Sequence, residues 1–164
     1  MATLRVKTDV HQWMQENFGY LRSSLYAIKS LNVDDYNCIA WAAGYTDQPW
    51  WPSKNPDDRS FWPPECERAL RVDAFICAFN TLGYQRCEFD SSLESDVEKV
   101  VIYVDTVKGE DLPCHMARQL ETGMWTSKLG RAWDIEHELV NGVECPDYGR
   151  ARYMMKRPRG MTPR

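Results

Sequence analysis

The chain has 164 residues, enough for one domain with a substantial core. Hydrophobic residues make up 43% and charged residues 27%, a balance typical of globular proteins. A formal net charge of −4 disfavours general nucleic-acid binding, and the absence of any run of 18 apolar residues disfavours a membrane helix. Because the N-terminus has no apolar signal region, we expect a cytoplasmic protein, or one exported without a cleaved signal peptide.

We expect a single domain over residues 1–158 and a basic, disordered tail over residues 159–164, where charges alternate with glycine and proline. The six cysteines include no C-x-x-C pair, which disfavours a zinc ribbon or finger. Without a signal peptide, most of them are expected to be reduced and packed as small hydrophobic residues.

In chain order, the first predicted element is a helix near residues 9–16. Asn37, or one of the two aspartates before it, can cap a second helix that begins near Cys38 and ends at Gly44. Residues 45–64 form a loop rich in proline and tryptophan, and a loop of that length in a compact domain is usually functional or a packed lid. The apolar residues of 65–82 lie on one face of a third predicted helix.

The hydrophobic period then changes from that of helices to that of strands. Strands are predicted at residues 84–89, 100–104, 114–120, 124–128 and 150–156, with a hairpin turn at 121–123. Residues 133–139 are expected to form a helical turn or a short helix. Together these elements predict an α+β domain in which the cysteine-bearing helix packs on an antiparallel β-sheet.

The most informative residues are Cys38, at the start of a predicted helix, and His115, 77 residues later on a predicted strand. A thiol is a good nucleophile only as a thiolate, which a helix N-terminus and a nearby imidazole both favour. Ser127 is expected across the hairpin from His115, where its hydroxyl can orient the ring. The other candidates for this third role are Gln119, Thr126, Asp134 and Glu136.

Neighbouring residues of a strand point to opposite faces, so only one of Cys114 and His115 can face the helix, and we assign that position to His115. Two structural interpretations compete, in which Cys38 is ordinary core and His115 is a buried structural histidine. A zinc site of Cys38, His115 and His137 is conceivable, but spacing gives it no support, and we expect no metal or other cofactor. Candidate substrate-binding residues, which packing of the loop explains equally well, are Trp41, Trp50, Trp51 and Trp62.

Six motifs resemble an uncharacterised bacterial domain family over about residues 18–158. They lie at residues 37–42 (NCIAWA), 50–52 (WWP), 62–64 (WPP), 115–119 (HMARQ), 125–130 (WTSKLG) and 134–137 (DIEH). More distantly, the chain resembles the papain-like superfamily, nearest to the NlpC-type cell-wall peptidases and the transglutaminase-like proteins. That resemblance implies a papain-like fold with Cys38 as nucleophile, His115 as base and Ser127 as the third residue. A serine departs from those branches, which usually have His, Asn, Gln or Asp in the third place.

The resemblance and the residues together predict a thiol-dependent amide hydrolase or acyltransferase: a peptidase, amidase or deamidase acting through a thioester at Cys38. Its substrates would be peptide or protein amides, peptidoglycan included, and in that version the protein is an antibacterial effector. The alternative is a non-catalytic papain-like binding module that contacts a partner protein through the loop at residues 45–64. Neither hypothesis involves a nucleic acid or a membrane.

Overall fold

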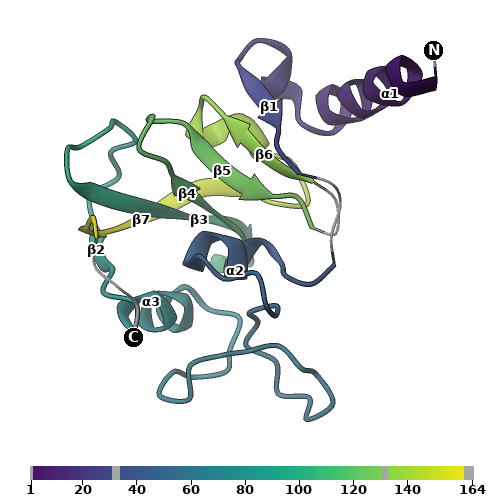
Figure 1. Ribbon diagram of the computed structural model, residues 1–164. Helices are drawn as coiled ribbons and strands as arrows, with labels where there is room; N and C mark the ends of the chain where they lie inside the picture. The colour runs from purple at the N-terminus through teal and green to yellow at the C-terminus, as the bar shows by residue number, and fades with distance from the viewer. Residues whose placement is uncertain (1, 31–33, 131–132, 161–164) are drawn as a thin grey trace.

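The structure is a computed structural model that describes residues 2–30, 34–130 and 133–160. Within these residues the chain forms a seven-stranded antiparallel sheet of order β1-β6-β5-β4-β3-β7-β2 (Figure 1). The strands are β1 (Tyr26–Ile28), β2 (Gln85–Cys87), β3 (Val97–Val107), β4 (Glu110–Gln119), β5 (Trp125–Lys128), β6 (Asp134–His137) and β7 (Arg150–Pro158). The helices are α1 (Ala2–Asn17), α2 (Cys38–Ala43) and α3 (Val72–Asn80), with the 3-10 turns η1 (Gly19–Arg22) and η2 (Val140–Val143).

The prediction of a papain-like α+β fold is wrong, because the described chain is dominated by this sheet and its helices are few and mostly short. The predicted secondary structure differs from the structure at two segments in particular. The helix expected over residues 65–82 begins only at Val72, and residues 134–137 form the strand β6, which pairs with both β5 and β1. Short apolar runs fit either period, so pairing with neighbouring strands decides their state. The short helix at Cys38 is present as predicted.

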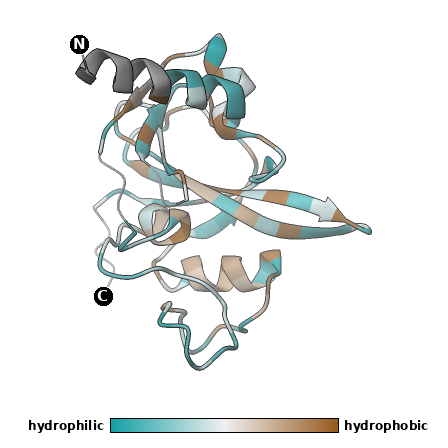
Figure 2. Ribbon diagram, turned by 90° about the vertical axis from the view of Figure 1, so that its right-hand side faces the viewer, coloured by the Kyte–Doolittle hydropathy of each residue, from teal (hydrophilic) through white to brown (hydrophobic). Residues whose placement is uncertain are grey.

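The remaining strands agree with the sequence in position and differ in length. The strand expected at 100–104 extends to eleven residues in β3, which pairs with β4 on one side and β7 on the other. The tip of the β3–β4 hairpin is exposed and extends beyond the body of the sheet (Figure 2). Strand β1 at the sheet edge was not predicted, since three residues are too few to show a period.

Two hydrophobic clusters cover the two faces of the sheet, as the period of a strand requires. Val100, Ile102 and Val104 of β3 pack with α2, α3 and the loop before α3, all on one side of the sheet (Figure 1). Val101 and Tyr103 pack on the other face, with residues of α1, η1 and η2. We call these the α2 face and the α1 face.

The segment from residue 45 to α3 has no regular helix or strand, and a disulfide anchors it to α3. This bond joins Cys66 to Cys77 of α3, whereas Cys38, Cys87, Cys114 and Cys145 are free thiols. Four of the six cysteines are therefore reduced, as expected for most of them, and Cys66 and Cys77 are the exceptions.

At the C-terminus, the backbone N–H of Arg159 donates to the carbonyl of Asp96 and its guanidinium to that of Val97. Arg159 is thus held against the sheet, and residues 161–164 of the expected tail lie outside the described residues. Among the described residues, no helix has both the length and the apolar character that crossing a membrane requires.

Candidate functional site

Cys38 begins α2, and Asn37 caps that helix as its sequence position predicts. The Asn37 side-chain oxygen accepts the backbone N–H of Ala40 at 3.0 Å, which satisfies one of the free donors of the first turn. At the other end, Gly44 takes a left-handed conformation with φ 91° and closes the helix. These two caps explain why a six-residue helix is stable at this place.

The thiol of Cys38 is buried among the residues of the α2 face, with 9% of its surface exposed. It accepts a backbone hydrogen bond from Met116 of β4. β4 pairs with β5 only at Arg118 and Gln119, which leaves the earlier part of β4 open to α2. Burial is the largest influence on this thiol and raises its pKa to about 11, so the thiol is protonated at neutral pH.

His115, Ser127 and His137 form a buried hydrogen-bonded chain on the α1 face. His137 Nδ1 donates to the Leu139 carbonyl at 2.7 Å, which makes its Nε2 an acceptor for the Ser127 hydroxyl at 2.8 Å. The Ser127 oxygen in turn accepts from His115 Nε2 at 3.1 Å. His115 Nδ1 is then the unprotonated nitrogen, and it has no hydrogen-bond partner.

Burial keeps His115 and His137 neutral. The ring of His115 stacks on Tyr148, with centroids 4.4 Å apart, and meets the ring of Tyr103 edge-on. Desolvation, followed by the proximity of His137, lowers the pKa of His115 to about 3. Desolvation likewise lowers the pKa of His137 to about 4. Neither ring is charged at neutral pH.

The structure therefore brings His115 and Ser127 together, as predicted, and joins neither to Cys38 by a hydrogen bond. Met116 packs on the α2 face, so alternation turns the neighbouring His115 to the α1 face, contrary to the expectation that it faces the helix.

The other candidates for the third role have partners elsewhere. Thr126 accepts from Trp41 and donates to the Ile135 carbonyl. Gln119 donates to the carbonyls of Ser91 and Gly123. Asp134 accepts from Tyr36, and Glu136 forms an ion pair with Lys29. None of them has a hydrogen bond to His115, so Ser127 alone among the candidates contacts the ring. Across the described part of the chain, no three His, Cys, Asp or Glu side chains are grouped so that they could hold a metal ion.

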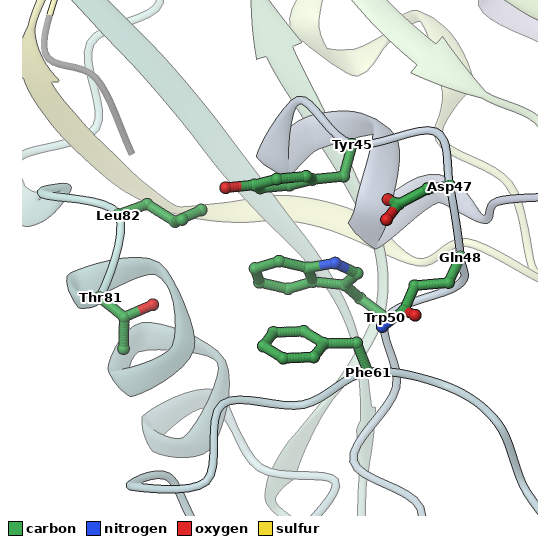
Figure 3. Close-up of a pocket in the computed structure, with 7 residues that line it drawn as sticks. All are labelled: Tyr45, Asp47, Gln48, Trp50, Phe61, Thr81 and Leu82. Atoms are coloured by element: carbon green, nitrogen blue, oxygen red, sulfur yellow. The ribbon is translucent and has the colours of Figure 1, made fainter. Parts of the chain in front are cut away.

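A pocket of about 360 Å³ opens elsewhere, between the loop after α2 and the end of α3 (Figure 3). Its lining consists of Tyr45, Asp47, Gln48, Trp50, Phe61, Thr81 and Leu82. The volume lies near the lower end of the range for ligand pockets, about 300–1,000 Å³. We call it the aromatic pocket.

Short-range hydrogen bonds hold the aromatic residues of this pocket in place. Asn37, besides capping α2, accepts the backbone N–H of Trp50 at 3.0 Å and donates to its carbonyl at 2.8 Å. Trp50 also forms a bridge with Phe61, whose N–H donates to the Pro49 carbonyl. Tyr45 follows the left-handed Gly44, and its N–H donates to the carbonyl of Ala40. The C-terminal end of α2 thus positions Tyr45, which forms one wall of the pocket.

The four tryptophans predicted to bind substrate lie in different environments. Trp50 lines the aromatic pocket. Trp62 is buried, and its indole donates to the carbonyl of Glu67. Trp51 packs edge-on against Phe75, and Trp41 stacks on Tyr36 on another side of α2. Of the four, only Trp50 lines the aromatic pocket, and the other three pack against neighbouring side chains.

Sequence reasoning identified the loop and missed most of the lining residues, Tyr45, Asp47, Gln48, Phe61, Thr81 and Leu82. The available signals were the aromatic residue directly after the helix-ending Gly44 and the second aromatic cluster at residues 61–62. The contribution of α3 had no local signal, because it depends on how that helix docks on the sheet.

Comparison with known proteins adds a family and no described activity. Residues 27–156 match the family described as Domain of unknown function (DUF7689). No curated protein and no solved structure matches the chain. The matched segment contains α2, the aromatic pocket and every strand except part of β1 and the end of β7. The chain therefore belongs to the DUF7689 family.

Proposed function

We propose that this protein is a binding module that captures an apolar side chain of a partner protein in the aromatic pocket. The observation that supports it is the pocket itself, whose lining includes four aromatic or aliphatic side chains and in which hydrogen bonds from Asn37 fix the backbone of Trp50. Tyrosine and tryptophan are the residues that most often dominate the free energy of protein–protein binding.

The chemistry at Cys38 favours binding over catalysis. Its thiol is protonated and buried, and the imidazole expected to activate it donates to Ser127 instead. Cys38, His115 and Ser127 do not line the aromatic pocket, nor the hollows of the described chain beside Met154, Pro158 and Gly149.

The test is selection of peptides from a random library on the immobilised protein, followed by affinity measurements on variants. We expect the selected peptides to share one apolar residue and to bind Tyr45→Ala at least about tenfold more weakly. Tyr20→Ala is the matched control, because Tyr20 is 48% exposed and lies outside the aromatic pocket. Equal affinity for the wild type and for folded Tyr45→Ala contradicts the proposal.

A thiol-dependent amide hydrolase is the second candidate function. It is favoured by the hydrogen bond between His115 and Ser127 and by the free Nδ1 of His115. Labelling with iodoacetamide near pH 8 separates the two candidates. The binding module requires Cys38 to react more slowly than the partly exposed Cys87, Cys114 and Cys145, because burial protects it. Fastest reaction at Cys38 supports the hydrolase instead.

A further inference from the structure

Trp50 is enclosed so that a ligand can reach only the edge of its indole. Tyr45 stacks on it at a centroid distance of 5.4 Å and an interplanar angle of 21°, and Phe61 lies at 4.8 Å (Figure 3). Phe79 contacts the same ring at 6.2 Å. With 4% of Trp50 exposed, neither face is free for a sugar or a cation to stack on.

The edge of Trp50 carries a hydrogen-bond donor without a partner in the described chain. The indoles of Trp41 and Trp62 donate to Thr126 and to the Glu67 carbonyl, whereas the Trp50 indole has no such acceptor. The buried polar atoms that lack a partner in the described chain do not include Trp50 Nε1, so this nitrogen keeps some contact with water. Indoles that lose such contact usually find an acceptor. A ligand that displaces this water can supply the acceptor instead.

A negatively charged hydrogen-bond acceptor lies in the same pocket. The Asp47 carboxylate lines the same pocket, and Figure 3 shows it on the side of the indole that carries the nitrogen. No ion pair or hydrogen bond joins Asp47 to another side chain within the described residues, and it does not bond to Trp50. The Trp50 indole donor and the anionic Asp47 acceptor thus lie beside the apolar surface of Leu82, in a lining that also contains the polar groups of Tyr45, Gln48 and Thr81.

From this arrangement we infer that the aromatic pocket recognises a backbone amide together with the adjoining apolar side chain, in an extended peptide segment. The inference rests on the proposed function. In a trans amide the C=O and N–H point in opposite directions. The carbonyl can accept from the Trp50 indole while the N–H donates to Asp47, and the apolar side chain lies against Leu82.

Other ligand classes fit less well. A carboxylate or phosphate meets the negative charge of Asp47. A lysine or arginine can pair with Asp47, but it brings no acceptor for the Trp50 indole and finds no open aromatic face. A sugar needs an open aromatic face for stacking. A volume of about 360 Å³ holds one side chain and its amide, and it is small for a large planar cofactor.

The experiment uses three probes with one isobutyl group, namely N-methylisovaleramide, methyl isovalerate and isovalerate. Binding to the full chain is followed by the indole N–H signals in a ¹H–¹⁵N spectrum, where Trp50→Phe identifies the signal of Trp50 among the seven tryptophans. We expect the amide to shift that signal downfield. The ester, which lacks the N–H, should bind roughly threefold to tenfold more weakly, and isovalerate more weakly still.

The variant Asp47→Asn should raise the affinity for isovalerate relative to that for the amide, because the charge that repels the carboxylate is removed while a side-chain oxygen still accepts. Asp57→Asn, an exposed acid of the same loop, is the control. Equal affinities for the three probes, or a Trp50 signal that does not move, overturn amide recognition while capture of apolar groups stands. Absence of binding by all three overturns the inference, and the peptide selection then decides the proposed function separately.

Discussion

Acid should destabilise this protein through its two buried histidines, and replacing one of them should remove about half of that effect. His115 and His137 have folded pKa values of about 3 and about 4, against about 6.5 for an unperturbed histidine. Between these limits only the unfolded chain binds the protons. The folded state therefore has its full stability above about pH 6.5 and loses it as the pH falls toward the folded values.

The magnitude between pH 7 and pH 5 follows from the unfolded pKa alone, because both folded values lie below 5. Each histidine contributes about 1.4 kcal/mol per pH unit over about 1.5 units, or about 2 kcal/mol. The two together lower the free energy of unfolding by about 4 kcal/mol. That loss is large compared with the usual stability of about 5–15 kcal/mol for a domain.

The informative variant is His115→Phe, which keeps a ring against Tyr148 and leaves Ser127 bonded to His137. Its fall in stability from pH 7 to pH 5 should be about 2 kcal/mol smaller than that of the wild type. Urea unfolding at pH 7, 6 and 5, followed by circular dichroism, measures both falls. Carboxylates that also titrate are present in both proteins, so their effect cancels in the difference.

The control Tyr103→Phe also loses a buried polar group, the hydroxyl that donates to the Val140 carbonyl, but it keeps both histidines. It should be less stable at pH 7 and show the wild-type fall of about 4 kcal/mol. A wild-type fall in His115→Phe would refute the reasoning, since it would mean that His115 binds its proton equally in the folded and unfolded states.

Two further predictions concern the supports of the aromatic pocket. Replacing Cys66 and Cys77 together by serine opens a loop with a sequence separation of 11. Under oxidising conditions this should lower the free energy of unfolding by about 3 kcal/mol, measured by urea unfolding. An unchanged midpoint of the urea transition contradicts this prediction. Asn37→Ala removes three hydrogen bonds and should cost about 2–3 kcal/mol, whereas Asn37→Ser keeps the cap and should cost less, by the same assay. Equal stability of the two Asn37 variants would show that the cap contributes nothing measurable, since both variants lose the bonds to Trp50.

Local signals in the sequence predicted the elements that depend on near neighbours. The cap at Asn37, the helix at Cys38, the left-handed Gly44 and the hairpin after His115 all follow from residues within a few positions of a turn or helix end. The fold class failed because it depends on which segments pair. Residues 134–137 are a strand only because β1 and β5 flank them, and β1 is too short to predict.

The expectation that His115 faces the helix of Cys38 is wrong for a related reason. Cys38 lies on the α2 face, so His115 would have to point to that face of β4 to meet it. A shift of one residue in the register of β4 reverses the face to which His115 points. The register of β4 against β3 is irregular between Tyr103 and Val104, where Cys114 has no pairing partner. No local pattern foretells such an irregularity, so a prediction from alternation alone could not assign the face of His115.

Asn37 links the two parts of the molecule that carry candidate functions. Its side chain caps the helix that begins with Cys38 and also holds the backbone of Trp50 in the aromatic pocket. A ligand that moves Trp50 therefore acts on the first turn of α2, through bonds worth about 1 kcal/mol each. Tyr45, in contrast, is fixed from the far end of α2. Asn37→Ala should thus affect both the pocket and the reactivity of the thiol, whereas Tyr45→Ala should affect the pocket alone.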